Sequence, residues 1–180
     1  MNVTVVGAGI IGHAVAWELA SRGASVRILD PRGSGQGASR ASAGVLAPAI
    51  EGHSNAFLKL ASCSLGCYDP FLARLQGDTD QPVEYQRSGT LQVALDEQQA
   101  EELRATARRL ADTGVAHAFM DATSARQFEP GLSERASAAL LIPQHGYVRV
   151  SALMAALADA CSRRGVEISM AAVQIGRAHV

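Results

Sequence analysis

The chain has 180 residues, of which 48% are hydrophobic and 18% charged, and its formal net charge is −1. This composition can bury a core and is not that of a disordered segment. A net charge so close to zero gives no electrostatic signature of nucleic-acid or anionic-membrane binding. No apolar run approaches the roughly 18 residues of a spanning helix, and the first strand pattern begins too early for a signal peptide. We therefore expect a cytoplasmic protein with no integral membrane segment and no nucleic-acid partner.

The first 30 residues have the pattern strand, helix, strand. Two short aliphatic runs, 3–6 and 26–29, flank a segment with apolar side chains at helical spacing that stops at Gly23. Two strands joined by a helix in this way lie parallel, with a right-handed crossover. The pattern predicts a βαβ unit.

A glycine motif, Gly7-x-Gly9-x-x-Gly12, stands between the first run and the helix. Gly7 permits a tight turn, Gly9 lets the backbone approach a pyrophosphate, and Gly12 lets the helix pack closely on the strand. The free N–H groups of the helix N-terminus attract the pyrophosphate. Asp30, at the end of the second run, can accept hydrogen bonds from ribose hydroxyls. These residues predict a site for an adenine dinucleotide.

The rest of the chain is a mixture of helix and strand patterns. Residues 31–49 are rich in glycine, serine and alanine, a composition that suits close approach of backbone to a ligand. Periodicity predicts helices at 55–76, 96–113 and 151–164, strands at 83–85, 89–95, 115–120 and 138–142, a turn at 143–146 and a buried strand at 166–170. This order predicts a nucleotide-binding domain interrupted by a second domain at roughly 77–147.

Few side chains suggest further chemistry. Cys63 and Cys67 would share a helix face without further ligands at metal-binding spacing, so we expect buried thiols. His13 is expected at the surface of its helix and Trp17 in the core. Since neither a Ser-His-Asp nor a Cys-His arrangement is present, we predict no catalytic side chain and no metal site in this chain.

Four segments together carry a family resemblance. They are GASRASAGVLAP at 37–48, RSGTLQVAL at 87–95, FEPGLS at 128–133 and the stretch from His145 to Ile168. The chain resembles the FAD-dependent D-amino-acid oxidase superfamily, and within it the glycine oxidases of thiamine biosynthesis, from residue 2 to about residue 170. The resemblance covers the N-terminal half of the proteins of that family. It implies an α/β fold: a Rossmann-like FAD-binding domain, incomplete, at 1–76 and 148–174, interrupted by part of a mixed α+β substrate domain at 77–147.

The resemblance also implies cofactor contacts. They fall in five groups: Gly7, Gly9, Ile10, Ile11 and Gly12 beneath the FAD pyrophosphate, Asp30 and Pro31 at the adenosine ribose, Ala38 and Ser39 at the pyrophosphate, Ala43, Gly44 and Val45 along the isoalloxazine, and Val173 on the adenine side.

The activity implied is flavin-dependent oxidation of the amine of a small amino acid, glycine-like or D-configured. The products are an imine and then a 2-oxo acid, with hydride transfer to FAD and reoxidation by dioxygen. Glycine, sarcosine, D-amino acids and proline-like amines stay open as substrates, and a quinone stays open as acceptor. The carboxylate-binding arginine of the family lies in the C-terminal half. We therefore expect the 180 residues alone to be inactive. The oligomeric state of the full-length protein stays open, and a homo-oligomer is one of the alternatives.

Two other functions share the glycine motif: an NAD-dependent Rossmann dehydrogenase and a non-catalytic nucleotide-binding fragment. The second glycine- and alanine-rich segment disfavours the dehydrogenase. Residues 175–180, IGRAHV, depart from the family pattern and read like a translated sequencing adapter. We predict that they are a non-native tail on a truncated reading frame.

Overall fold

The computed structural model describes residues 1–50 and 55–173. It divides into two compact units: unit 1 comprises 1–45, 66–85 and the chain from Val148 onward, and unit 2 comprises 46–65 and 86–147. The chain passes between them at the short strands β3 (Val45–Leu46), β4 (Tyr85–Gln86) and β8 (Gly146–Val148), and at the end of helix α3 (Asn55–Gly66).

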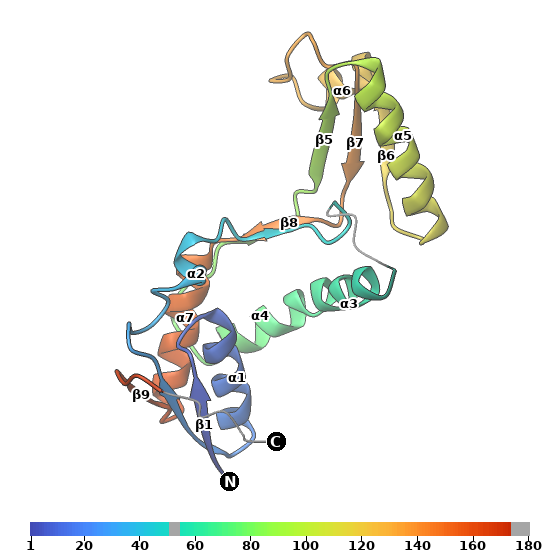
Figure 1. The fold of residues 1–180 in the computed structure, drawn as a ribbon. Helices are drawn as coiled ribbons and strands as arrows, with labels where there is room; N and C mark the ends of the chain where they lie inside the picture. The colour runs from blue at the N-terminus through green and yellow to red at the C-terminus, as the bar shows by residue number, and fades with distance from the viewer. Residues whose placement is uncertain (51–54, 174–180) are drawn as a thin grey trace. The chain divides into compact units, whose positions relative to one another are not determined.

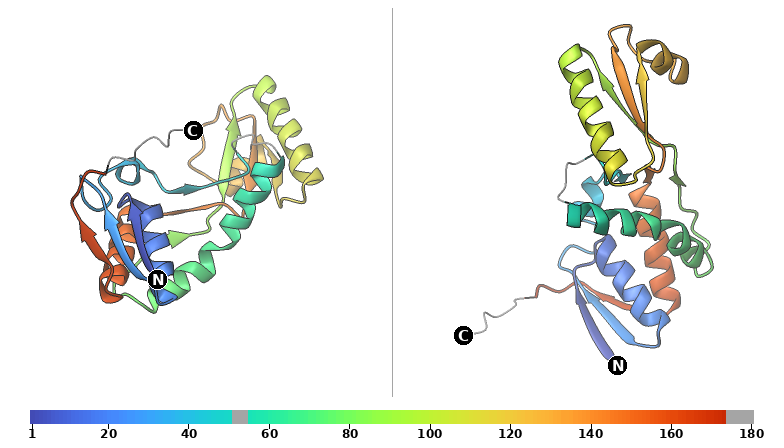
Figure 2. Two further views of the ribbon diagram at one scale, coloured as in Figure 1. Left: turned by 60° about the horizontal axis from the view of Figure 1, so that its bottom comes forward. Right: turned by 90° about the vertical axis from the view of Figure 1, so that its right-hand side faces the viewer.

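Unit 1 contains the predicted βαβ unit. Strands β1 (Asn2–Val6) and β2 (Ser25–Leu29) pair in parallel, and β9 (Glu167–Ser169) joins the other side of β2, giving the strand order β1-β2-β9. Helix α1 (Ile10–Ser21) packs against β1 and β2, and helix α7 (Val150–Arg163) packs beside α1 (Figures 1 and 2). The Rossmann-like α/β fold class is confirmed.

The core of unit 1 lies between α1, β2 and α7. Trp17, Ile28 and Leu157 are almost wholly buried in it. The indole Nε1 of Trp17 donates to Asp78 Oδ2 at 2.8 Å, and Arg164 donates two hydrogen bonds to the same carboxylate at 2.6 and 2.7 Å. The hydrogen bonds from Arg164 are the main reason that the pKa of Asp78 is lowered. This carboxylate therefore ties the segment after α4 (Tyr68–Gln76) to α1 and to the end of α7.

Unit 2 is an antiparallel sheet with a helix against one face. Its strands β5 (Thr90–Ala94), β7 (Ala138–Ile142) and β6 (Ala118–Asp121) have the order β5-β7-β6, and α5 (Glu97–Asp112) packs against all three (Figure 1). Leu140 and Ile142, two residues apart in β7, lie on the same face of the strand and pack with Leu110 of α5.

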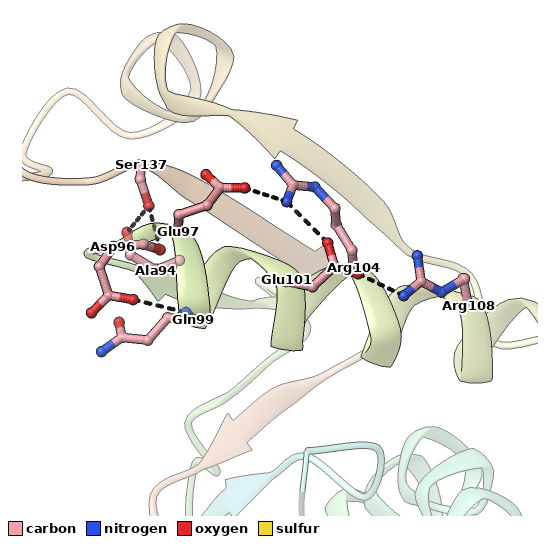
Figure 3. Close-up of polar contacts among 8 residues, drawn as sticks. All are labelled: Ala94, Asp96, Glu97, Gln99, Glu101, Arg104, Arg108 and Ser137. Atoms are coloured by element: carbon pink, nitrogen blue, oxygen red, sulfur yellow. Dashed lines mark hydrogen bonds and ion pairs between the residues drawn. The ribbon is translucent and has the colours of Figure 1, made fainter.

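Polar groups fix the start of α5 (Figure 3). The Asp96 carboxylate caps the helix by accepting the Gln99 N–H at 2.8 Å. Ser137, just before β7, donates its hydroxyl to the Ala94 and Asp96 carbonyls at 3.2 and 3.1 Å. On the exposed side of α5, Arg104 and Arg108 pair with Glu97 and Glu101, which adds little stability because water screens these charges.

Several sequence expectations need correction. The predicted helix 55–76 is two helices, α3 and α4, because Pro70 has no N–H to donate to the preceding turn and its ring clashes there. Cys63 and Cys67 are exposed and not buried. Strand β9 is present, but all three of its residues are exposed. His13 is wholly buried and not at the surface.

Other elements were missed or shorter than expected. Helices α2 (Ala38–Ala41) and α6 (Ala122–Phe128) and strands β3 and β8 were not predicted. The strand predicted at 83–85 is β4, which starts two residues later and ends one residue later. Helix α6 is too short for a periodic signal, but Asp121 caps it by accepting the Ser124 N–H at 2.8 Å. No helix within the described ranges has the length and apolar character that crossing a membrane requires.

The two units also differ from the predicted domain ranges. Residues 46–65 belong to unit 2 and residues 77–85 to unit 1, whereas the sequence placed the domain boundaries at 76/77 and 147/148. The break between α3 and α4 allows this, since the two helices belong to different units. The second predicted boundary, at 147/148, coincides with a boundary between the units. The functions assigned to the two domains stay predictions, and residues 175–180 lie outside the described part of the chain.

A buried histidine holds segment 46–50 within unit 2. His145 is fully buried, and its Nε2 accepts the Ala49 N–H at 3.3 Å. Its Nδ1 therefore carries the proton and donates to Thr90 Oγ1 at 2.7 Å. Burial, with a smaller contribution from the Arg87 charge, lowers the pKa of His145 from 6.5 to about 4.

We predict that unit 2 loses stability as the pH falls from 6.5 to 4. In this window the unfolded chain binds a proton on His145 that the folded chain does not, so stability falls with pH, by up to about 3 kcal/mol at pH 4. Urea unfolding followed by circular dichroism at pH 7, 5.5 and 4 measures this. His145→Gln should flatten the pH dependence and His117→Gln should leave it in place. Equal pH dependence in the wild type and His145→Gln would contradict the assignment.

Candidate functional site

The turn after β1 depends on two glycines. Gly7 has φ +105°, a conformation that side chains rarely adopt, and its N–H donates to the Leu29 carbonyl at 2.8 Å. A Cβ on Gly12 would lie 1.9 Å from the Gly7 carbonyl oxygen, closer than any real contact. The first turn of α1 thus sits directly on the end of β1, as the sequence predicts for these glycines.

Asp30 follows β2 and is almost wholly buried. Its Oδ2 accepts the Ala8 N–H at 3.0 Å and its Oδ1 accepts the Arg32 N–H at 2.7 Å. These two bonds, the one from Ala8 first, lower the pKa of Asp30. The Arg32 side chain also forms an ion pair with Oδ1, its Nε lying 3.9 Å away. Asp30 therefore holds the glycine turn in place, and Pro31 beside it is exposed.

Ser39 faces the N-terminus of α1. Its Oγ accepts the Ile10 N–H at 2.9 Å, and a Cβ on Gly9 would lie 3.1 Å from the same oxygen. The Ile10 N–H, expected to face the pyrophosphate, is therefore bonded to the serine in this structure. Ile11, the next residue, is 74% exposed. The structure brings Ser39 to the glycine turn from 29 residues away along the chain.

The N-terminus of α1 suits an anion. Gly9 is the N-cap residue and has no side chain to cap the helix, and no acidic residue lies in the first turn. The helix dipole therefore gives this end a positive potential that no carboxylate of the first turn cancels. Ala38, beside Ser39 in α2, is exposed.

The predicted flavin-ring segment has a flat backbone. Gly44 has φ +74°, and a Cβ there would lie 1.9 Å from the Val148 carbonyl oxygen. The Val148 N–H donates to the Gly44 carbonyl at 2.9 Å, so the segment lies flush against the chain that enters α7. Ala43 and Val45 on either side are exposed, Val45 by 62%. The contact of this segment with an isoalloxazine ring stays a prediction.

A cavity of about 420 Å³ adjoins these segments. It lies between residues 34–43 and the start of α7, and Ser39 and Ala43 are among the residues that line it. Val173 follows β9 and is 39% exposed, and its place on the adenine side stays a prediction.

Sequence reasoning missed two residues of this site. His13 is buried one turn into α1, where its ring contacts the Gly9 carbonyl and the Ser34 hydroxyl. Because His13 follows Gly12 in a helix that must pack closely on a strand, its position in the sequence could have predicted its burial. Cys161 donates to the His13 carbonyl at 3.5 Å, and burial raises the pKa of that thiol to about 11, which makes it unreactive.

We predict that Gly12→Ala destabilises unit 1 by at least about 3 kcal/mol, since the added methyl group overlaps the Gly7 carbonyl and the helix must move. Gly66→Ala is the matched control because a Cβ there meets nothing within 4 Å. Thermal unfolding followed by Trp17 fluorescence measures both. A Gly12→Ala protein as stable as Gly66→Ala would show that the helix and the turn are not in contact.

Comparison with known proteins agrees with this geometry. A family model described as FAD dependent oxidoreductase matches residues 2–177. Glycine oxidase of Geobacillus kaustophilus is 31% identical over 166 residues, covering 91% of this chain and 44% of that protein, and its crystal structure superposes with a TM-score of 0.87.

Two further relatives support the same assignment. The crystal structure of glycine oxidase from Bacillus cereus is 29% identical with a TM-score of 0.83, covering 92% of this chain and 46% of that one. A bifunctional protein ThiO/ThiG of Nostoc is 28% identical over 169 residues, covering 93% of this chain and 25% of that protein. The chain spans less than half the length of these relatives. With the glycine turn, Asp30 and the family match in agreement, the chain belongs to the FAD-dependent oxidoreductase family.

Proposed function

We propose that unit 1 binds FAD through the residues gathered at the first turn of α1. Asp30 would accept hydrogen bonds from the adenosine ribose, the N-terminus of α1 and Ser39 would hold the pyrophosphate, and Gly44 with its neighbours would lie under the isoalloxazine. The observation that carries the proposal is the convergence of Asp30 and Ser39 on the same glycine turn, at Ala8 and Ile10.

We further propose that the complete protein oxidises the amine of a small amino acid, as its glycine oxidase relatives are named for doing. When bound, FAD supplies the redox chemistry: it accepts the hydride from the substrate α-carbon and passes the electrons to dioxygen. The resulting imine hydrolyses in water to a 2-oxo acid. The role of this chain is to bind and orient the cofactor. The lack of an acid–base triad among the described residues is therefore compatible with the reaction.

The two units would have different roles. Unit 1 carries the cofactor residues, and unit 2, with most of residues 77–147, would form part of the substrate domain. We expect the 180 residues on their own to hold FAD weakly and to be inactive, since more than half of the relatives' length lies beyond the matched region. The relatives named glycine oxidase favour glycine as substrate, and the ThiO/ThiG relatives favour a role in thiamine biosynthesis.

The test is the absorbance and turnover of the purified complete protein. We expect a flavin absorbance spectrum and, after denaturation, one mole of released FAD per mole of protein. We also expect hydrogen peroxide to form faster with glycine than with sarcosine, D-alanine or L-proline. Turnover with a quinone but not with dioxygen would replace the proposed acceptor. Binding of NAD in preference to FAD would overturn the cofactor assignment.

We predict that Asp30→Asn raises the dissociation constant for FAD about tenfold, because a charged acceptor of two ribose hydroxyls is lost. Asp112→Asn, an exposed change in unit 2, is the control. Titration followed by quenching of flavin fluorescence measures both.

The pH dependence of FAD binding tests the same residue. The bonds from Ala8 and Arg32 lower the pKa of Asp30 below its ordinary 3.8, so the carboxylate is ionised throughout the neutral range. Its contribution to binding is lost only as the pH falls through that lowered value. The FAD affinity should therefore stay constant between about pH 8 and pH 5. A loss of affinity near pH 6 in the wild type that Asp30→Asn removes would contradict this.

A further inference from the structure

His13 is a buried polar residue with defined partners for both ring nitrogens. Its Nδ1 lies 3.1 Å from the Gly9 carbonyl oxygen, which can only accept, so Nδ1 carries the proton. Its Nε2 is therefore the acceptor, and the Ser34 hydroxyl donates to it at 3.3 Å. The side chain is fully shielded from water in this arrangement. The two contacts join the ring to two segments, residues 9 and 34, that are distant along the chain.

The Gly9 carbonyl receives a second bond from the same residue, from the His13 backbone N–H at 3.0 Å. The peptide bond from Gly9 to Ile10 is trans, since no described peptide bond is cis. In a trans peptide the carbonyl and the next N–H point in opposite directions from one rigid plane. Two bonds on the Gly9 oxygen therefore fix the direction of the Ile10 N–H, which points to Ser39 Oγ.

The second ring nitrogen holds the chain that leads to Ser39. Ser34 is bonded to His13, and the next residue, Gly35, donates its N–H to the Ala8 carbonyl at 2.7 Å. The first contact attaches residue 34 to α1, and the second attaches residue 35 to the turn that precedes it. One side chain thus sets the direction of an N–H donor and helps to place the serine opposite it.

We propose that His13 is a positioning residue for the pyrophosphate of the cofactor, acting through the Gly9–Ile10 peptide and through Ser34. The proposal rests on the FAD binding proposed above. It concerns the pyrophosphate and not the adenosine, because the Asp30 contacts with Ala8 and Arg32 do not involve the histidine. Loss of His13 should therefore weaken ligands that carry a pyrophosphate more than ligands that lack one.

The test compares ADP with adenosine as competitors of FAD on the purified complete protein. His13→Leu removes both ring contacts and should weaken FAD and ADP about tenfold while adenosine changes less than about twofold. His13→Asn keeps an amide N–H where Nδ1 stands and should recover most of the ADP affinity. Ser34→Ala removes one contact and should weaken ADP about threefold. His117→Leu, a histidine of unit 2 bonded to the Val115 carbonyl, is the control.

The outcomes separate this proposal from the proposed function. A wild type that binds neither FAD nor ADP overturns both. A wild type that binds FAD, with variants that change ADP and adenosine affinity equally or not at all, overturns only the role of His13. If His13→Leu does not fold, Ser34→Ala decides: an unchanged ratio of ADP to adenosine affinity rejects the proposal, and a threefold fall supports it.

Discussion

The approach of α1 to the end of β1 is the constraint on which the candidate site depends. With only hydrogen atoms on its α-carbon, Gly12 lets the helix begin against the Gly7 carbonyl, where a methyl group would stand 1.9 Å from the oxygen. That approach places the free N–H end of α1 beside the carboxyl ends of two parallel strands. In an open α/β sheet this is where ligands bind, because the loops after the strands and the helix N-terminus face the same space.

Three residues of the stretch 30–39 bond to that turn or to the first turns of α1. Asp30 holds the Ala8 N–H, Ser39 accepts the Ile10 N–H, and Ser34 reaches the ring of His13. The segment from residue 31 to 39 is thereby attached to the helix start at several points. A glycine-rich loop gains a defined shape in this way, since the bonds supply the rigidity that its side chains lack. The same bonds determine which N–H groups face a ligand.

The unit 2 sheet depends on a different kind of contact. Its inner face is aliphatic, with Leu140 and Ile142 against Leu110 of α5, and His145 joins segment 46–50 to this core. Neither feature brings reactive groups together, and no cluster of three or more metal-ligating side chains occurs among residues 1–50 and 55–173. These contacts give unit 2 an aliphatic core between its sheet and α5.

By itself the sequence determined the βαβ unit, the glycine turn and the family, because each depends on neighbours in the chain: the 2.0 and 3.6 residue periods, and glycines at fixed spacing. Tertiary structure alone decided which groups meet. Ser39 bonds Ile10 across 29 residues, and His13 is buried because the 31–37 segment and α7 cover that face of α1. The break at Cys67 has a local cause in Pro70, which the sequence already contained. The exposure of Cys63, by contrast, depends on the tertiary surroundings of its helix. The burial of a residue and its hydrogen-bond partners depend on segments distant in sequence, so local sequence patterns cannot predict them.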